Sequence, residues 1–481
     1  MQVKKIVSLC AVAFTAMAAG QAQAAMSAAE QAIVNDAVTN GRVLFISGAS
    51  ATQKGFTGII NSMFTGTTIR FANTTASSKD FEAVAGKLAA GAGAWSNQNV
   101  IIIDRVKGGS VWGVNSVARN EKIEALVVNS ACGSDGSGTA SLPYTCATTG
   151  EVDTATTGIA PDAGVSDVAP GLFKAPYNTE GETPADSLTE AELAELVANP
   201  IYALAFGVPV TKNVPLVNLN KAAVSVIMAG GVGTWNQVDA SLPADDIVVC
   251  RRVPGSGTQA VDNLYFGNFP CSSEFNTPAD RYASGAWDDA ARTFTVTGGT
   301  GALVVVENST SGDVVNCLDK AVTGGTFAGK DRDGHAIAVD FGAGGHKAIG
   351  VLSMDSLAKS KSTGNWQFRS LDGAGTITWD NTANAPVTTG TGKFPTLANL
   401  IDGTWDLQGW ISFQIPTRTT GAKKSLAEAF LLKAQNPAIL ASITDLKNVS
   451  AAIPGGAYSG AQVLRAQYLN NNQCAPLNRN F

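Results

Sequence analysis

Short apolar runs alternate with amphipathic segments along most of the chain, a rhythm typical of layered α/β proteins. Four runs rich in apolar and branched residues predict buried strands, at residues 42–47, 100–104, 123–128 and 247–252. Five segments predict helices, at residues 53–63, 79–90, 221–229, 425–433 and 461–469. In residues 79–90, Phe81, Val84 and Leu88 share one helical face. The sequence therefore predicts α/β layers with parallel strand pairing.

Two regions interrupt this rhythm. Residues 132–160 are rich in Gly, Ser and Thr and predict a long loop, and residues 269–343 alternate Thr and Val with Gly turns and predict a β-rich insertion. Within the insertion, Asp331-Arg332-Asp333-Gly334 resembles the start of a calcium loop but lacks the later acidic ligand. A hairpin turn is the favoured interpretation.

The N-terminus has the pattern of a secretory signal peptide. Lys4 and Lys5 precede an apolar run, residues 6–19, and Ala22-Gln23-Ala24 is a small-x-small site, so we expect residues 1–25 to be removed. A membrane anchor is the alternative, but the run is shorter than the roughly 20 apolar residues that a span needs. We expect a soluble bacterial protein, periplasmic or secreted.

Composition changes this picture little. Hydrophobic residues make up 45% of the chain and charged residues only 15%, below the roughly 25% of ordinary soluble proteins. The net charge is -6 and no basic run occurs, which argues against nucleic acid as a partner.

Six cysteines remain once Cys10 leaves with the signal peptide: Cys132, Cys146, Cys250, Cys271, Cys317 and Cys474. An even number in an oxidising compartment predicts disulfides, although the sequence alone leaves many pairings open. Cys132 with Cys146 brackets one loop and is the best supported pair, and Cys250 with Cys271 is the next local candidate. A metal site is disfavoured, because no CxxC occurs and His335 and His346 are the only histidines.

Three loops of small residues carry the candidate chemistry. Residues 47–52 and 255–258 each follow a predicted strand and precede a predicted helix, where free backbone N–H groups receive anions. Arg252, just before the second loop, can grip two oxygens of a tetrahedral oxyanion. The third loop, residues 161–170, contains Asp167, whose carboxylate can accept a hydrogen bond from a protonated phosphate but would repel sulfate.

The order of these motifs resembles that of the periplasmic phosphate-binding proteins of ABC transporters. Residues 46–52 (ISGASAT) are similar to the family's opening motif, residues 164–170 (GVSDVAP) to its serine-aspartate segment, and residues 251–258 (RRVPGSGT) to its arginine/glycine-serine-glycine-threonine motif. Residues 207–235 and 347–351 resemble two further family segments, so the resemblance touches most of the mature chain.

The resemblance implies a two-lobed periplasmic-binding-protein fold of type 2, here with a disulfide-tied loop and a β-rich insertion at about residues 269–343. Lobe 1 would comprise residues 26–199 and 416–481, and lobe 2 residues 200–415. Thr52 with the backbone of Ala51, and a serine for which Ser110 is preferred over Ser77 and Ser78, would donate to the ligand. Asp167 would accept the ligand proton and pair with Arg252. Ser256, Gly257 and Thr258 would supply further donors.

These expectations describe a monomeric, non-enzymatic carrier without cofactor or metal that binds phosphate or a similar oxyanion and serves an ABC transporter membrane complex. The chain departs from the family pattern where Gln53-Lys54 replaces an aromatic-proline pair, and in its serine loop and length, so ligand and transporter delivery stay open. A secreted phosphatase is one alternative, although GxSxG is absent and neither histidine lies in the motifs. An extracellular matrix or adhesion protein on the same fold is the other.

Overall fold

The structure is a computed structural model that describes residues 26–479, apart from residues 52, 76–78, 134–135, 151–157, 180–185, 217, 359–363 and 455–460. The predicted signal peptide, residues 1–25, lies outside the described residues. Among the helices of the described part, none combines the length and apolar character needed to cross a bilayer.

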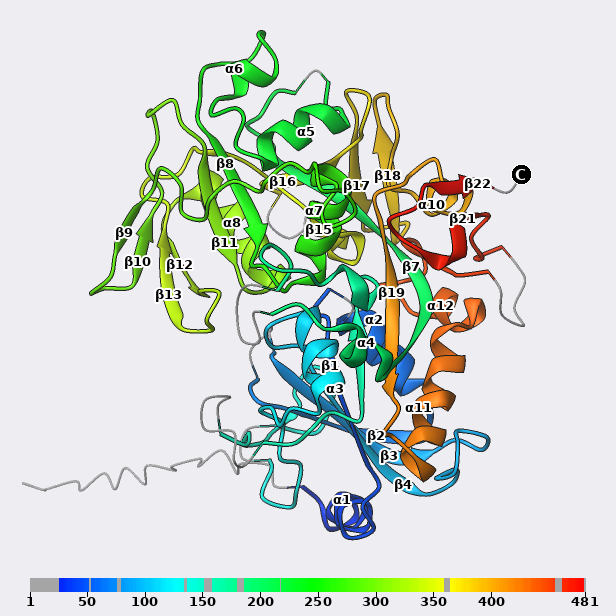
Figure 1. Ribbon diagram of the computed structural model, residues 1–481. Helices are drawn as coiled ribbons and strands as arrows, with labels where there is room; N and C mark the ends of the chain where they lie inside the picture. The colour runs from blue at the N-terminus through cyan, green and yellow to red at the C-terminus, as the bar shows by residue number, and fades with distance from the viewer. Residues whose placement is uncertain are drawn as a thin grey trace, which may run out of the picture.

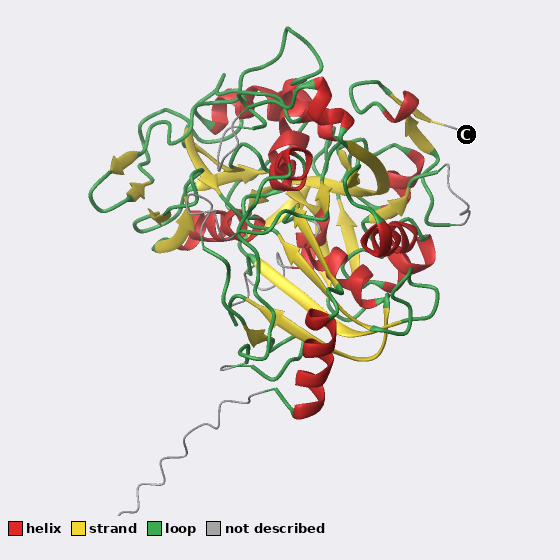
Figure 2. Ribbon diagram, turned by 60° about the horizontal axis from the view of Figure 1, so that its bottom comes forward, coloured by secondary structure: helices red, strands yellow, loops and turns green. Residues whose placement is uncertain are grey.

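One large mixed sheet forms the centre of the described chain, and Figure 2 shows its strands surrounded by helices and loops. Its main path, in spatial order, is β11 Val304–Asn308, β8 Ile247–Arg252, β14 Lys347–Gly350, β7 Leu196–Thr211, β19 Gln408–Pro416, β6 Ala163–Ser166, β1 Val43–Gly48, β4 Asn99–Arg105, β3 Phe81–Leu88, β2 Phe64–Ala72 and β5 Tyr144–Thr145. Five further strands branch from it, β15 Leu352–Ser353, β16 Trp366–Arg369, β17 Thr376–Asp380, β18 Ala385–Thr389 and β20 Ser450–Ala452.

Two long strands occupy the middle of this sheet. β7 and β19 pair antiparallel from Ala205 opposite Gln408 to Leu196 opposite Pro416, with one irregularity, and every residue of β19 is buried. The strands on the β6 side come from residues 43–166, and those on the β14 side from residues 247–350. The pair therefore joins two halves of the sheet that come from different parts of the chain.

Parallel pairing occurs where the sequence predicts it. β1 pairs in parallel with β4 and β6, and β8 pairs in parallel with β11 and β14. The carboxyl ends of parallel neighbours meet at one edge of a sheet, where ligands of α/β proteins usually bind. The loops that follow β1, β4 and β6 therefore leave the same edge.

The helices of the described chain are α1 Ala28–Thr39, α2 Gln53–Asn61, α3 Asn115–Arg119, α4 Glu190–Ala194, α5 Lys221–Met228, α6 Trp235–Val238, α7 Gly257–Gly267, α8 Ser311–Thr323, α10 Leu397–Asp402, α11 Gly421–Ala434 and α12 Pro437–Ser442. Helices α11 and α12, from the last quarter of the chain, pack against α2 near its beginning (Figure 1). The Phe56 and Phe430 rings pack at a tilt in this contact, with their centroids 4.6 Å apart.

The predicted strands at 42–47, 100–104 and 247–252 are confirmed as β1, β4 and β8, and the predicted helices at 53–63, 221–229 and 425–433 as α2, α5 and α11. The helix predicted at residues 79–90 is wrong, because this segment forms strand β3 between β2 and β4. Neighbours on both sides supply its backbone hydrogen bonds, and this pairing overrides a helical spacing of three apolar residues.

Two other predicted elements are also wrong. Residues 123–128 form no strand and make only isolated bridges, from Ile123 to Ile159 and from Leu126 to Thr148. The helix predicted at residues 461–469 is replaced by strand β21, Ala466–Tyr468, which pairs with β22, Leu477–Arg479. In both segments, backbone hydrogen bonds to neighbouring parts of the folded chain decide the conformation, and the local apolar pattern does not.

The β-rich insertion at residues 269–343 is confirmed only in part. β9 Ala286–Asp288, β10 Thr293–Thr295, β12 Thr326–Lys330 and β13 Ala336–Asp340 form a separate small sheet. β11 belongs to the main sheet, and α8 packs on β8 and β14. Part of the predicted insertion is therefore core.

Three disulfides link the six cysteines. Cys132–Cys146 is confirmed, whereas the Cys250–Cys271 pair is wrong, because the other bridges are Cys250–Cys317 and Cys271–Cys474. Cys250 lies in β8 and Cys317 in α8, and both are fully buried where the helix covers the strand. Packing of this helix, which the sequence did not predict, decides the pairing.

Candidate functional site

The loop after β1 lies directly against β6. The Ala49 N–H donates to the Val165 carbonyl at 3.1 Å. Gly48 has a φ of 145°, and a Cβ added there would lie 1.8 Å from the Val165 oxygen. Only glycine fits this approach, so the small residues of the opening motif bring its loop against the strand that leads to Asp167.

The segment after β4 crosses both of these strand ends. It forms the short helix η1, Ser110–Gly113, and a Cβ added at Gly113 would lie 2.7 Å from the Ser47 carbonyl oxygen. Ser110 is fully buried, and its Oγ accepts a hydrogen bond from the Asp167 N–H at 3.3 Å. The Val111 N–H donates to the Gly255 carbonyl at 2.9 Å, which joins this segment to the loop before α7.

The N-terminus of α7 closes the cluster from the other half of the sheet. A Cβ added at Gly257 would lie 2.3 Å from Ser110 Oγ and 2.6 Å from Asp167 Oδ2. Thr258 Oγ1 donates to Asp167 Oδ2 at 3.5 Å, a weak contact. The structure thus brings Ser110, Asp167 and the Ser256–Thr258 segment together, and we call these five residues the Asp167 cluster.

Several oxygens in and beside the Asp167 cluster are buried without hydrogen-bond partners. Within the described residues, this holds for Ser256 Oγ and Asp167 Oδ1, and for Ser47 Oγ and Ser50 Oγ of the opening motif. Ser256 occupies the N-cap position of α7, yet its side chain makes no capping bond. Buried polar groups are normally paired, so such a group indicates a place where a polar ligand or water binds.

Burial controls the charge of Asp167. The pKa of this carboxyl is raised to about 7, chiefly by desolvation and to a lesser degree by the Asp355 charge, while Arg252 and the Thr258 hydroxyl offset part of the rise. Near pH 7 the carboxyl therefore exists in both forms, as an acceptor when ionised and as a donor when protonated.

Arg252 lies at the end of β8 with its side chain buried. Its guanidinium donates to the Asn308 and Ser309 carbonyls and to Ser311 Oγ, on the segment between β11 and α8. Its charge reaches Asp167, because it lowers the pKa of that carboxyl. The predicted grip of Arg252 on two ligand oxygens stays a prediction.

The remaining predicted donors are less well described. Ala51 is buried in the loop before α2, whereas Thr52 lies outside the described residues, as do Ser77 and Ser78. The role of Thr52 stays a prediction.

The sequence analysis missed three buried residues beside this site, Asp104, Tyr202 and Asp355. Asp104 at the end of β4 is buried, both of its carboxylate oxygens lack hydrogen-bond partners within the described residues, and burial raises its pKa well above the usual range. Asp355 raises the pKa of Asp167. Desolvation, and then the charges of Asp355, Asp167 and Asp104, raise the pKa of the Tyr202 hydroxyl on β7. The position of Asp104, an acid directly after the apolar run of β4, could have marked it as a candidate site residue. Nothing in the local sequence marks Asp355 or Tyr202.

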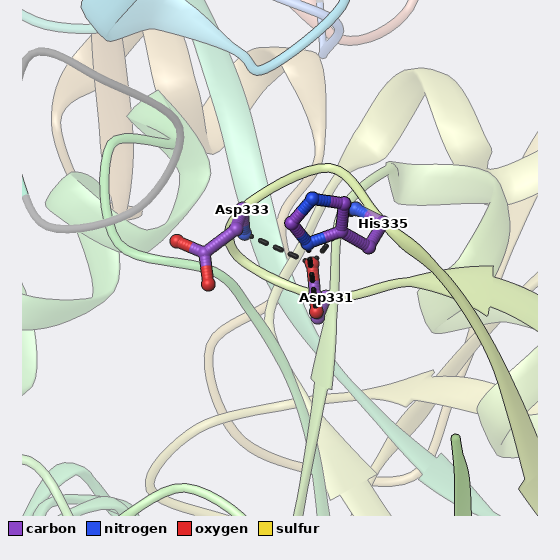
Figure 3. A group of neighbouring side chains, drawn as sticks. All are labelled: Asp331, Asp333 and His335. Atoms are coloured by element: carbon purple, nitrogen blue, oxygen red, sulfur yellow. Dashed lines mark hydrogen bonds and ion pairs between the residues drawn. The ribbon is translucent and has the colours of Figure 1, made fainter. Parts of the chain in front are cut away.

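Apart from the Asp167 cluster, Asp331, Asp333 and His335 form a group of possible metal ligands at the tip of the β12–β13 hairpin (Figure 3). Asp331 Oδ1 accepts the Asp333 and His335 N–H groups, at 3.0 and 2.8 Å, and the Asp331 carboxylate pairs with Arg292. These bonds close a turn, so the hairpin predicted for residues 331–334 is confirmed.

No family model and no curated protein matches the chain. Among solved structures, it aligns with a putative phosphate ABC transporter substrate-binding protein from Clostridium perfringens with bound phosphate, at 12% identity and a TM-score of 0.39, over 85% of this chain and 98% of that chain. A possible phosphate binding protein from Planctomyces limnophilus aligns at 11% identity and a TM-score of 0.34, over 85% of this chain and 92% of that chain. An ABC-type phosphate transport receptor from Vibrio cholerae aligns at 15% identity and a TM-score of 0.29, over 57% of this chain and 74% of that chain. These TM-scores are too low to establish fold or function, so the assignment below depends on the residues of this chain.

Proposed function

We propose that this protein is an exported, non-enzymatic solute-binding protein that holds an oxyanion, phosphate, at the Asp167 cluster. One observation carries the proposal. Segments that follow β4, β6 and β8 converge on a buried carboxyl, beside hydroxyl and carboxylate oxygens that have no hydrogen-bond partner in the described residues. Delivery of the ligand to an ABC transporter membrane complex is part of the same proposal.

In this proposal the protein has the two-lobed type 2 arrangement, with residues 26–199 and 416–481 in one lobe and residues 200–415 in the other. The central pair of β7 and β19 supports it, because both strands pass between the two halves of the sheet. The packing of α11 and α12 on α2 also supports it. The ligand would then sit between the lobes, and hinge motion would open and close the site.

Phosphate is favoured over sulfate because it carries a proton near neutral pH. Phosphate and Asp167 can share that proton in one hydrogen bond, whichever group holds it. Fully ionised sulfate has no proton to offer to an ionised Asp167, and a buried carboxylate repels it. The α7 N-terminus stabilises either anion, so Asp167 provides the discrimination.

Ser256→Ala tests the proposal. It removes a buried hydroxyl that bonds to no described residue, so we expect the thermal transition of the free protein to stay the same or rise. Loss of one hydrogen bond to a charged ligand, worth roughly 1.5–3 kcal/mol, would weaken phosphate binding about tenfold or more. Titration calorimetry with phosphate and sulfate measures both affinities. Absence of phosphate binding to the unaltered protein, or equal affinity in the variant, contradicts the proposal.

A further inference from the structure

A pocket of about 390 Å³ lies on the flank of α7, lined by Arg251, Arg252, Arg281 and Arg332. Gln259, Asn263, Tyr177, Pro254 and residues 278–280 complete its walls. At roughly 30 Å³ per water molecule, this space holds about a dozen waters, more than one tetrahedral oxyanion needs. We name it the arginine pocket.

Its arginines come from three separate segments. Arg251 and Arg252 end β8, Arg281 lies in the loop before β9, and Arg332 lies in the β12–β13 turn. Gln259 and Asn263 stand one helical turn apart on α7. Positive charge therefore faces the cavity from more than one wall.

This concentration of positive charge contrasts with the chain as a whole, whose formal net charge is -6. Among the described residues that line the pocket, Asp280 is the one acid beside the four guanidinium groups. The carboxyls of Glu307, Asp167, Asp262 and Asp313 interact with Arg251, Arg252 or Arg332 from outside this lining. Glu307 is fully buried and accepts from Arg251 at 3.0 Å and from Arg332 at 2.6 Å, and Asp280 is exposed at the rim. The lining itself carries more positive than negative charge, and a concave surface strengthens its field.

Glu307 also explains why the arginines stay in place without a ligand. Its ion pairs hold the Arg251 and Arg332 side chains, which are about nine-tenths buried, so their positions are fixed before an anion arrives. Arg281 is exposed, and its guanidinium lies 5.9 Å from the Tyr282 ring centroid.

We infer that the arginine pocket is a binding site for a condensed phosphate, such as tripolyphosphate. Guanidinium groups match the oxygens of phosphoryl groups in a two-point contact, and arginines on several walls can contact successive groups of one chain. An aromatic base or a lipid would need an apolar wall. The Tyr177 ring packs edge-on against Phe269 and Phe275, at 5.3 and 5.7 Å, and the other apolar lining is Pro254, Pro278 and Ala279.

The inference does not depend on the function proposed above. Two variants, Arg281→Gln and Ser256→Ala, separate the arginine pocket from the Asp167 cluster. Arg281→Gln removes an exposed charge from the pocket rim and leaves the buried Glu307 pairs intact. Arg465→Gln is its matched control, because Arg465 is also exposed and lines no part of the arginine pocket. Ser256→Ala alters only the Asp167 cluster.

Titration calorimetry on the full mature protein, with sodium tripolyphosphate and with orthophosphate, provides the test. We expect Arg281→Gln to weaken tripolyphosphate binding about tenfold and to leave orthophosphate binding unchanged. Ser256→Ala should leave tripolyphosphate binding unchanged, and Arg465→Gln should change neither affinity. The inference is overturned if the unaltered protein does not bind tripolyphosphate, or if Arg281→Gln and Arg465→Gln have equal effects. Binding of tripolyphosphate that depends on Arg281, without any orthophosphate binding, would support the inference and contradict the proposed function.

Discussion

Two buried carboxyls on or beside α7 have pKa values raised to about 7, those of Asp167 and Asp262. Desolvation is the largest cause in both, because neither group faces enough opposite charge to offset its burial. Both therefore change charge near neutral pH. Asp167 belongs to the proposed ligand site, and Asp262 is a buried residue of α7, the helix whose N-terminus forms part of that site.

Asp167→Asn should remove the pH dependence of anion discrimination. In the unaltered protein, sulfate affinity should rise as the pH falls from 8 to 6, because Asp167 becomes neutral through its pKa of about 7 and can then donate to sulfate. The amide of the variant is neutral throughout, so its sulfate affinity should vary little. Calorimetry at pH 6, 7 and 8 measures this. The same pH dependence in both proteins would show that Asp167 does not contact the anion.

Asp262→Asn should stabilise the protein at high pH. The raised pKa means that the folded protein binds the proton more tightly than the unfolded chain, so this group's contribution to stability falls as the pH rises from about 4 to about 7. The amide can still accept from Gln259 Nε2. We expect a gain on the order of 1–4 kcal/mol at pH 8 and a smaller one at pH 4. Thermal unfolding at both pH values checks this, and an equal change at both would contradict it.

At the scale of elements, the site depends on how closely η1, the end of β6 and the start of α7 approach one another. Glycine at position 257 permits that approach, because any side chain there would meet Ser110 Oγ and Asp167. Gly109 has a φ of 83° and faces the Ser256 backbone, where an added Cβ would lie 3.1 Å from Cα. Two glycines on opposite segments therefore set the spacing of the cluster.

Gly257→Ala should separate these segments and weaken phosphate binding by tenfold or more, because contacts below 3.0 Å force the backbone or the Asp167 side chain to move. Gly171→Ala is the matched control, since an added Cβ there meets nothing within 4 Å and the φ of Gly171 is not positive. Calorimetry with phosphate compares the two. Equal affinities would mean that the ligand does not bind where these segments meet.

At the scale of the whole molecule, disulfides connect distant parts of the chain. Cys271–Cys474 closes a segment of 203 residues, whereas Cys132–Cys146 closes one of 14. The C-terminal segment that carries Cys474 also reaches the Asp167 loop, because Gln473 Oε1 accepts the Ala169 N–H at 3.0 Å. This bridge therefore anchors a segment next to the proposed site.

Removal of Cys271–Cys474 by paired serine substitutions should lower the thermal transition more than removal of Cys132–Cys146. A longer closed loop restricts the unfolded chain more, with a stabilisation of about 3 kcal/mol for a 15-residue loop and above about 4.7 kcal/mol beyond 100 residues. Calorimetric scans of the two variants test the order. Mass spectrometry of the non-reduced protein should find no free thiol among the six cysteines of these bridges, and alkylation at Cys271 or Cys474 would contradict this pairing.

The sequence by itself determined the elements whose patterns are local. Apolar runs specified β1, β4 and β8, and apolar spacing specified α2, α5 and α11, because the pattern of an element that will bury one face or both faces is written in neighbouring residues. The loops after β1, β6 and β8 were also marked by their own residues. Glycine, serine and arginine beside a helix start have few common structural uses, so their chemistry was readable before their positions were known.

Only the tertiary structure decided the rest. Residues 81–88 became a strand because β2 and β4 lie on either side, and Cys250 joined Cys317 because α8 covers β8. Asp355 and the arginine pocket carry no local motif, since Arg281 and Arg332 belong to loops that only folding brings to Arg251. Contacts between residues far apart in sequence depend on the packing of whole elements, and no local pattern records them.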